Sequence, residues 1–420
     1  MDRLSVFQKT KKQHNEIYDI PYYKMMEKYI RFLGQDPRQK NEFRNIIVFI
    51  LVISIASILI PTTLELYISL RNKDMDGVIE CIPHFIASSI SAVKLLNLHF
   101  NRQNYNILFH FVIKKWQQLK SIYELNALDE TIMQGKRMAK LYRNTLFSFL
   151  ILYLFSDTLF SFLILFLLVP LVSPILDIVH PLNQTRSRQQ LLRVNYIIFD
   201  TDDYFFYIYL QLAWGSIIVV LTIIAADWFY ILIIHFNSGL FAVCGVQVLE
   251  ATMNSNLVSK DAFSENSSYE KFRTCVIMHN EVIEFYNILN ENCQYSYLIQ
   301  VGLNMLGMST TAVQTVINLD RPDVAIRSAV FFGANQFHLF LLSLPGQILL
   351  DHCADFANAI YDTTWYGTSL EIQKMLYMMQ IRSKKLCALT AGGLYDMNIE
   401  NFGITFKTCM SYFTMIMSLK

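Results

Sequence analysis

Seven long apolar stretches, separated by polar ones, constrain the fold of this 420-residue chain more than any other feature. They cover residues 45–70, 77–100, 145–171, 207–236, 295–319, 328–350 and 396–420. Each is long enough for a helix to cross a bilayer, which takes about 20 residues. The chain is 53% hydrophobic and 16% charged, against about 25% charged residues in soluble domains. The sequence therefore predicts an all-α integral membrane protein with seven transmembrane helices.

The basic residues predict how these helices are oriented. The segments 1–44, 101–144, 237–294 and 351–395 hold 25 Lys and Arg residues, whereas 71–76, 172–206 and 320–327 hold 7. Because cytosolic loops carry the excess of basic residues, we expect a cytosolic N-terminus and an extracellular C-terminus. The sequon at Asn183 would then lie outside the cell and be a candidate for glycosylation.

The same segments divide the chain into regions. We expect a cytosolic N-terminal segment at 1–44, four transmembrane helices at 45–236 with an outer loop at 172–206, cytosolic helical extensions at 237–294, two transmembrane helices at 295–350, cytosolic helices at 351–395, and the seventh transmembrane helix at 396–420. Helical spacing of apolar residues in 237–294 indicates that the extensions continue the fourth and fifth spans and pack on each other.

The last apolar stretch carries one continuous stripe. Its members follow the +4, +3 spacing of a helix face: Asn401, Thr405, Thr408, Tyr412, Met415 and Leu419. A spanning helix with such a stripe is what several copies need to enclose a water-filled path, so we predict that this helix lines a pore. The alternative is a final helix packed in a bundle, with its Thr and Ser hydroxyls bonded back to its own carbonyls.

A second candidate site lies in the predicted outer half of the bundle. Asp157 in the third span is an intramembrane acid, which is a functional candidate because a charge is costly there; the alternative is a neutral acid hydrogen-bonded to a neighbour. Aromatic and polar residues on neighbouring spans could form a pocket for a small, mostly apolar molecule. The predicted pocket consists of His84, Phe85, Ser88, Asp157, Thr158, Phe162, Phe206, Leu210, Ala213, Trp214, Phe331, Phe332 and Asn335. Aromatic stripes between membrane helices that only pack are the competing interpretation.

Several protein classes are disfavoured. The net charge of +1 gives no footprint for nucleic acid, and the seven cysteines show neither close pairing nor a CxxC motif, so neither a disulfide framework nor a zinc site is expected. No enzyme motif or cofactor-binding motif is present. A rhodopsin-type receptor would need an Asp-Arg-Tyr after the third span and the opposite orientation. A transporter would more usually show internal repeats.

Motifs in the last quarter of the chain resemble those of the insect odorant receptor family. They are Gly346-Gln347, Cys353, Ala357, Tyr361, Trp365-Tyr366, Leu389-Thr390-Ala391-Gly392, Met397-Asn398, Glu400-Asn401-Phe402 and Ser411-Tyr412-Phe413-Thr414. The helices before them are divergent and support the topology alone.

The resemblance implies a ligand-gated, non-selective cation channel assembled as a tetramer in the plasma membrane of an olfactory neuron. Divergent members of the family bind a volatile odorant and assemble with a shared co-receptor, and the cytosolic helices would form the anchor domain where subunits meet. Thr408, Tyr412, Met415 and Leu419 would line the pore, with Met415 and Leu419 at a hydrophobic gate. A gustatory-type receptor channel and a membrane transporter remain the alternatives.

Overall fold

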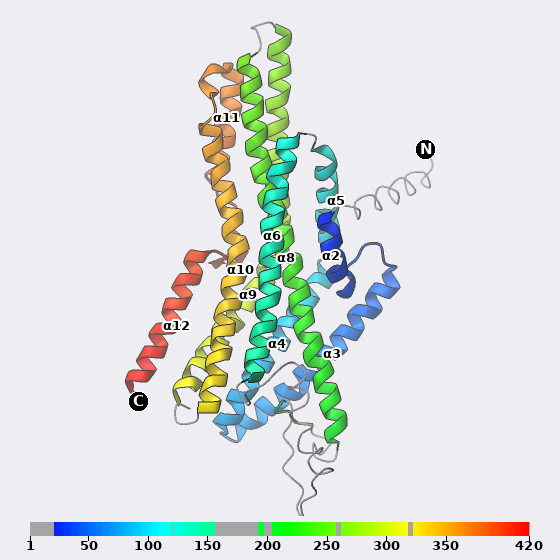
Figure 1. Cartoon of the computed structure of the whole chain (residues 1–420), viewed down its shortest axis with the longest axis vertical. Helices are drawn as coiled ribbons and strands as arrows, with labels where there is room; N and C mark the ends of the chain where they lie inside the picture. Colours follow the sequence, from blue (N-terminus) through cyan, green and yellow to red (C-terminus); the bar gives the residue numbers. More distant parts are fainter. Residues whose placement is uncertain are drawn as a thin grey trace, which may run out of the picture.

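The computed structural model describes residues 21–119, 121–155, 192–196, 204–257, 262–317 and 322–419, and these form ten α-helices and one small hairpin (Figure 1). The elements are α2 (Pro21–Phe32), α3 (Asn41–Arg71), α4 (Met75–Phe100), α5 (Arg102–Gln118), α6 (Ile122–Phe155), α8 (Phe205–Leu257), α9 (Ala262–Ile317), α10 (Pro322–Tyr361), the 3₁₀ turn η1 (Trp365–Gly367), α11 (Leu370–Ser383), β1 (Thr390–Ala391), β2 (Tyr395–Asp396) and α12 (Ile399–Leu419). The predicted all-α fold class is confirmed.

Helix α8 is the centre of the bundle. It packs against α2, α3, α4, α6, α9 and α10. Its middle turns, 224–241, are buried on every side, which explains why apolar residues occur all round the helix rather than along one stripe, with Asp227, His235, Asn237 and Ser238 buried among them. At 53 residues α8 is about 80 Å long, far more than the roughly 30 Å hydrocarbon core of a bilayer.

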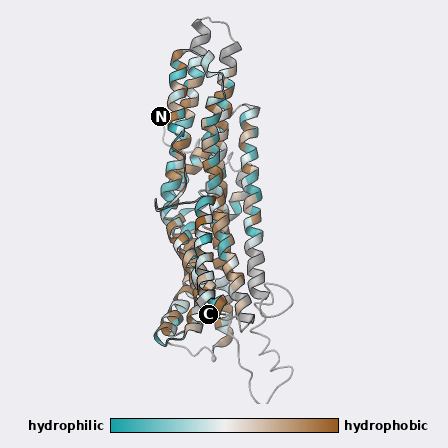
Figure 2. Ribbon diagram, turned by 90° about the vertical axis from the view of Figure 1, so that its left-hand side faces the viewer, coloured by the Kyte–Doolittle hydropathy of each residue, from teal (hydrophilic) through white to brown (hydrophobic). Residues whose placement is uncertain are grey.

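Three of the described helices are long and apolar enough to cross a membrane by length and composition: Asn41–Arg71, Glu80–Phe100 and Phe205–Met253. The bundle has two parts: hydrophilic and hydrophobic residues are mixed in the part that carries the α8–α9 tips, and hydrophobic residues are more frequent in the other part (Figure 2). Helices α8, α9 and α10 run through both parts, so each joins a mostly apolar segment to a more polar one.

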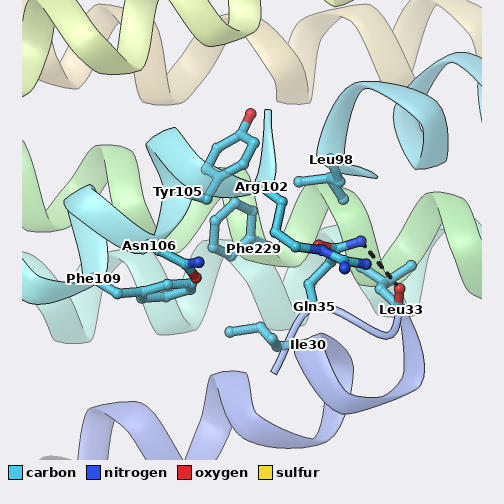
Figure 3. Close-up of a pocket in the computed structure, with 9 residues that line it drawn as sticks. All are labelled: Ile30, Leu33, Gln35, Leu98, Arg102, Tyr105, Asn106, Phe109 and Phe229. Carbon is cyan, nitrogen blue, oxygen red and sulfur yellow. Dashed lines mark hydrogen bonds between the residues drawn. The ribbon is translucent and has the colours of Figure 1, made fainter. Parts of the chain in front are cut away.

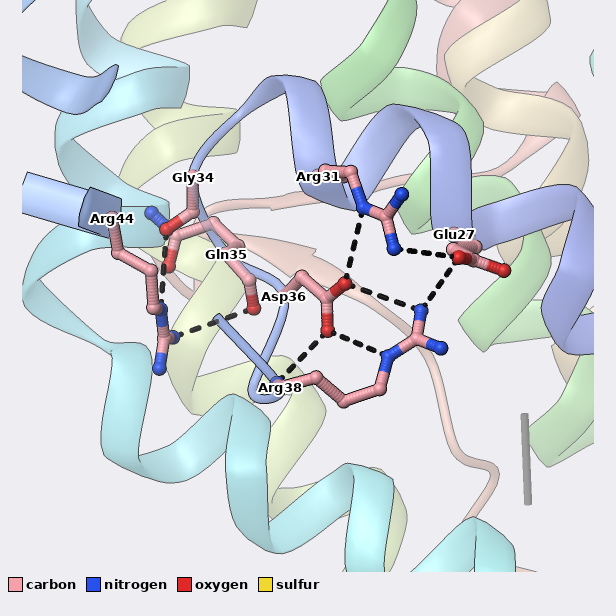
Figure 4. A network of polar contacts seen from close by, with 7 residues as sticks. All are labelled: Glu27, Arg31, Gly34, Gln35, Asp36, Arg38 and Arg44. Atoms are coloured by element: carbon pink, nitrogen blue, oxygen red, sulfur yellow. Dashed lines mark hydrogen bonds and ion pairs between the residues drawn. The ribbon is translucent and has the colours of Figure 1, made fainter. Parts of the chain in front are cut away.

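Helix α2 is amphipathic and lies against α8, as a helix with one apolar face does. Met26 and Ile30 on that face are buried, and the Tyr29 ring stacks on Trp228 with centroids 4.7 Å apart. The turn after α2 is held by an ion-pair network in which Arg31 contacts Glu27 at 2.8 Å and Arg38 contacts both Glu27 (2.8 Å) and Asp36 (3.2 Å) (Figure 4).

The region 351–395, for which the sequence predicted helices, also contains a short β-hairpin. After α11 the chain forms the antiparallel pair β1–β2, in which Thr390 faces Asp396. The reason is the dipeptide Gly392-Gly393, whose φ angles of 61° and 71° fit a turn and not a right-handed helix. The helix predicted for 396–420 consequently begins at Ile399, after the hairpin.

Candidate ligand site and pore helix

Asn335 lies where α4, α9 and α10 meet. A Cβ on Gly307 of α9 would lie 3.0 Å from Ile86 of α4 and 3.1 Å from the side-chain nitrogen of Asn335. The glycine therefore leaves the space that the amide occupies. Asn335 is buried, and its Nδ2 has no hydrogen-bond partner among the described residues. A buried amide donor of this kind is unusual, and a small polar group of a ligand or a water would satisfy it.

The other predicted pocket residues divide into two groups. On α4, His84 and Phe85 are half-buried and flank Ile86, and the buried Ser88 donates its hydroxyl to the carbonyl of His84 at 2.5 Å. On α10, Phe331 and Phe332 are half-buried, and Phe332 packs against the core. The structure thus places the α4 and α10 residues on adjoining helices, together with α9, which the sequence analysis did not include.

The residues predicted on α8 lie elsewhere. Phe206, Leu210 and Trp214 are more than half exposed on the surface of the described chain, while Ala213 is buried. The Trp214 indole donates a hydrogen bond to Ser54 of α3 at 3.1 Å. This stripe of α8 therefore lies beside α3 and on the outside of the described bundle.

Four of the predicted site residues lie outside the described part of the chain: Asp157, Thr158, Phe162 and the sequon residue Asn183.

A buried polar cluster joins five helices, α4, α6, α8, α9 and α10. The Lys94 ammonium of α4 pairs with the Asp227 carboxylate of α8, and Tyr142 of α6 donates its hydroxyl to the same carboxylate. Nε2 of His338 on α10 lies 3.6 Å from Asp227, and its Nδ1 lies 3.4 Å from Oδ1 of Asn304. Lys94 and Asp227 are fully buried, so each charge is compensated by the other.

The sequence contained a signal for this cluster. Lys94 and Asp227 are ionisable residues inside apolar spans, and such residues usually pair with each other. They lie 133 residues apart, however, so no local pattern could show that they are partners.

Helix α12 lies on one flank of the bundle, where it contacts α9 and α10 (Figure 1). The inner end of the predicted stripe faces protein, because Thr405 is buried and bonds to the Tyr395 hydroxyl at 3.3 Å. Further along, Thr408 and Met415 are exposed in the single chain. The side chains of Tyr412 and Leu419 lie outside what the structure describes.

The Thr hydroxyls of α12 do bond back to their own helix, as the alternative interpretation predicts. Thr405 bonds to the carbonyl of Asn401 at 3.0 Å, and Thr408 bonds to that of Ile404 at 2.9 Å. The exposed side of the helix, however, is not packed in the bundle of this chain.

Two cavities were found in the described residues outside this region. One, between α2, α4, α5 and α8, has a volume of about 10 Å³, which is room for a single water (Figure 3). At its edge Arg102 donates to Gln35 and Asn45 at 3.3 and 3.1 Å and thereby ties the α2–α3 turn to α5. The other, of about 310 Å³, lies between η1, α11 and the end of α10. Among the described residues, no group of His, Cys, Asp and Glu could hold a metal ion.

The far part of the bundle carries its own ionic contacts. Lys114 and Lys115 of α5 both pair with Glu281 of α9. Burial acts to raise the pKa of Glu281, but the two lysine hydrogen bonds outweigh it, so the pKa lies below its usual value. His279, two residues before Glu281 in α9, packs between Phe241 and Phe356, and burial lowers its pKa to about 4.

The fold defines an all-α, multi-span membrane protein, and comparison with known proteins identifies its class more closely. The sequence model described as "7tm Odorant receptor" matches residues 74–410. Among curated proteins, Odorant receptor 63a of Drosophila melanogaster is 23% identical over 46% of this chain and 44% of that protein. Odorant receptor Or2 of Anopheles gambiae is 20% identical over 42% of this chain and 48% of that protein. These alignments span less than half of each relative.

Solved structures show the same fold. The insect olfactory receptor OR5 from Machilis hrabei superposes with a TM-score of 0.73 at 15% identity, covering 94% of this chain and 97% of that one. Its complex with eugenol superposes with a TM-score of 0.71 at 14% identity, covering 94% and 98%.

The chain belongs to the seven-transmembrane odorant receptor family, since the family model matches most of its length. Its seven-helix membrane fold follows from that membership and from the shared structure, and the protein is a receptor and not an enzyme. Of the receptor classes that the sequence left open, the matching model is that of odorant receptors.

Proposed function

We propose that this protein is the odorant-binding tuning subunit of an odorant-gated, non-selective cation channel, assembled as a heterotetramer with the insect odorant receptor co-receptor. The proposal places it in the plasma membrane of an olfactory sensory neuron dendrite, with its N-terminus in the cytosol and its C-terminus outside. Its further partners are the lipid bilayer and the permeating cations.

The position of α12 carries the proposal. Among the described residues, α12 packs mainly on α9 and α10 and leaves Thr408 and Met415 exposed. This exposed side can pack against other subunits. Four such helices around an axis would surround a path lined by Thr hydroxyls and closed by larger apolar side chains. This arrangement needs no cofactor.

A second apolar surface supports assembly away from the pore. Tyr361, Tyr366, Leu370 and Tyr377 are each more than 60% exposed around η1 and α11. Two of them, Tyr361 and Tyr377, line the cavity of about 310 Å³. Exposed apolar patches of this kind mark surfaces that pair with another protein. We assign this surface to contacts between subunits in the cytosolic anchor domain.

The odorant would bind between α4, α9 and α10, beside Asn335. In this proposal the half-buried His84 and Phe85 of α4 and Phe331 and Phe332 of α10 would supply contact area, and the Asn335 amide would supply a hydrogen-bond donor. A volatile molecule that is mostly apolar and carries one acceptor oxygen fits this chemistry. The related OR5 protein was solved in complex with eugenol.

The test is whole-cell current in cells that express this chain with and without an insect odorant co-receptor, under a broad panel of volatiles. Inward cation current that needs both chains and an odorant is the expected result. Current from this chain alone would remove the obligate partner. No current in any combination, with the protein present at the cell surface, would refute the channel and favour a transporter.

A further inference from the structure

Helix α10 connects the proposed ligand site to the base of α12. Helix α10 carries Phe331, Phe332 and Asn335 in its first half and Gly346-Gln347 about three turns further on, directly after Pro345, which lies inside the helix. The chain that leads into α12 lies directly against this second position. Any movement of α10 as a rigid body is therefore felt at both places.

The contact between α10 and this chain is made by backbone. A Cβ on Gly346 would lie 1.9 Å from the carbonyl oxygen of Met397, two residues before α12 begins. Next to it, the Gln347 side chain accepts a hydrogen bond from the N–H of Ile399, the first residue of α12, at 3.2 Å. The first N–H groups of a helix have no partner inside it, so Gln347 caps α12 from another helix.

The amide of Gln347 is itself held in place. Its Nε2 donates to the Asp351 carboxylate, one turn along α10, at 2.7 Å. On the α12 side, the N–H of Asn401 bonds to Oδ1 of Asn398 at 2.8 Å. The first turn of α12 thus has one cap from its own segment and one from α10.

The hairpin that precedes α12 is hydrogen-bonded to α9, which restricts how the start of α12 can move. Thr390 N–H bonds to Oδ1 of Asn290 at 2.8 Å, and Gly392 N–H bonds to the carbonyl of Gln294 at 3.0 Å. In the first turn of α12, the ring of Phe402 lies 5.2 Å from the ring of Phe340 on α10. The start of α12 is therefore held against α9 through the hairpin N–H groups, and against α10 through Gln347 and the Phe340–Phe402 contact.

We propose that Gln347 is a positioning residue that couples α10 to the gate helix, an inference that rests on the proposed channel function. When odorant binding shifts α10, the Gln347 amide transmits the shift to the N-terminus of α12 through its bond to Ile399. The residue touches neither the odorant nor the ions. Its loss changes how strongly ligand binding biases the pore, not whether the chain folds or binds.

The first test compares odorant dose–response curves for Gln347→Ala, Gln347→Glu and the double variant Gln347→Glu/Asp351→Asn, each expressed with the co-receptor. A neutral hydrogen bond corresponds to a factor of about three to ten, so Gln347→Ala should shift the half-maximal concentration by that factor at unchanged surface amount. Gln347→Glu should also shift it, because two carboxylates then face each other. The double variant keeps both hydrogen bonds and should return to within about twofold of the parent. Gln103→Ala, at an exposed glutamine of α5, is the matched control.

The proposal is overturned if Gln347→Ala keeps the parent's dose–response curve and basal current at equal surface amount. It is equally overturned if the double variant remains as impaired as Gln347→Ala, because the effect would then not come from these two hydrogen bonds.

A second measurement does not depend on current. Amide hydrogen exchange of the purified full-length chain should be faster at Ile399–Asn401 in Gln347→Ala than in Gln103→Ala. If the parent gives no current in any combination, the channel function fails, and this exchange measurement still decides whether Gln347 orders the start of α12. Equal exchange in the two variants would refute the coupling contact itself.

Discussion

Replacing Gly346 by alanine should disrupt the junction of α10 with the chain entering α12. The new methyl group would lie 1.9 Å from the Met397 carbonyl oxygen and 3.0 Å from its carbon. Because the first distance is more than about 1 Å below van der Waals contact and the obstructing atom is backbone, no side-chain rotation can relieve it. Overpacking costs about 1–3 kcal/mol where side chains can adjust, so we expect about 3 kcal/mol or more here.

The assay is the thermal midpoint of the full-length protein in detergent, followed by fluorescence-detected size exclusion. Gly302→Ala is the matched control, since a Cβ there meets nothing within 4 Å and alanine is the better helix former by up to about 1 kcal/mol. Gly346→Ala should melt several degrees below the parent, and Gly302→Ala at or above it. Equal midpoints for the two variants would refute the close approach of α10 and Met397.

Three further changes have defined outcomes. Asp227→Leu should sharply reduce the amount of folded protein, because it leaves the buried Lys94 ammonium without its carboxylate at a cost of about 3–5 kcal/mol. The double variant Lys94→Met/Asp227→Leu should recover most of the folded protein. A double variant that is no more stable than the single one in a thermal melt in detergent would contradict this prediction. Burial lowers the pKa of His279 to about 4, so this side chain stays neutral in the folded protein, whereas in the unfolded chain it takes up a proton near pH 6.5. The free energy of unfolding should therefore fall by up to about 3 kcal/mol as the pH drops from about 6.5 to about 4. His279→Phe should flatten that loss between about pH 7 and pH 5, and an unchanged pH dependence of the melting midpoint would exclude His279 as its source. Met415→Ala should raise the basal current at equal surface amount, because a smaller side chain weakens the hydrophobic closure of the pore, and a basal current equal to the parent's would argue against a gate at Met415.

Apolar runs were enough to predict the helical membrane fold, because the bilayer forces backbone groups to pair within each spanning segment. The hairpin at Gly392-Gly393 was not predicted, although two adjacent glycines are a turn signal. The site was harder. That Asn335 lies beside Ile86 and Gly307 depends on how three helices cross, and no local sequence pattern shows such contacts between distant segments.

The α8 residues show the same limit. Phe206, Leu210 and Trp214 are four residues apart and so lie along one helix face. Which neighbour the face meets depends on the rotation of α8 about its axis, and the Trp214 indole bonds to α3. Periodicity gives a shared face, not its partner.

The central claim, that α12 lines a pore, is tested most directly by the accessibility of engineered cysteines to a charged thiol reagent during odorant-evoked current. Met415 and Phe406 are nine residues apart, about two and a half turns, and so lie on opposite faces of α12. With the co-receptor present, the reagent should block current through Met415→Cys and leave Phe406→Cys and the parent unaffected. Block of Phe406→Cys with no effect on Met415→Cys would contradict the assignment of the pore face, and no block of either variant would contradict the pore.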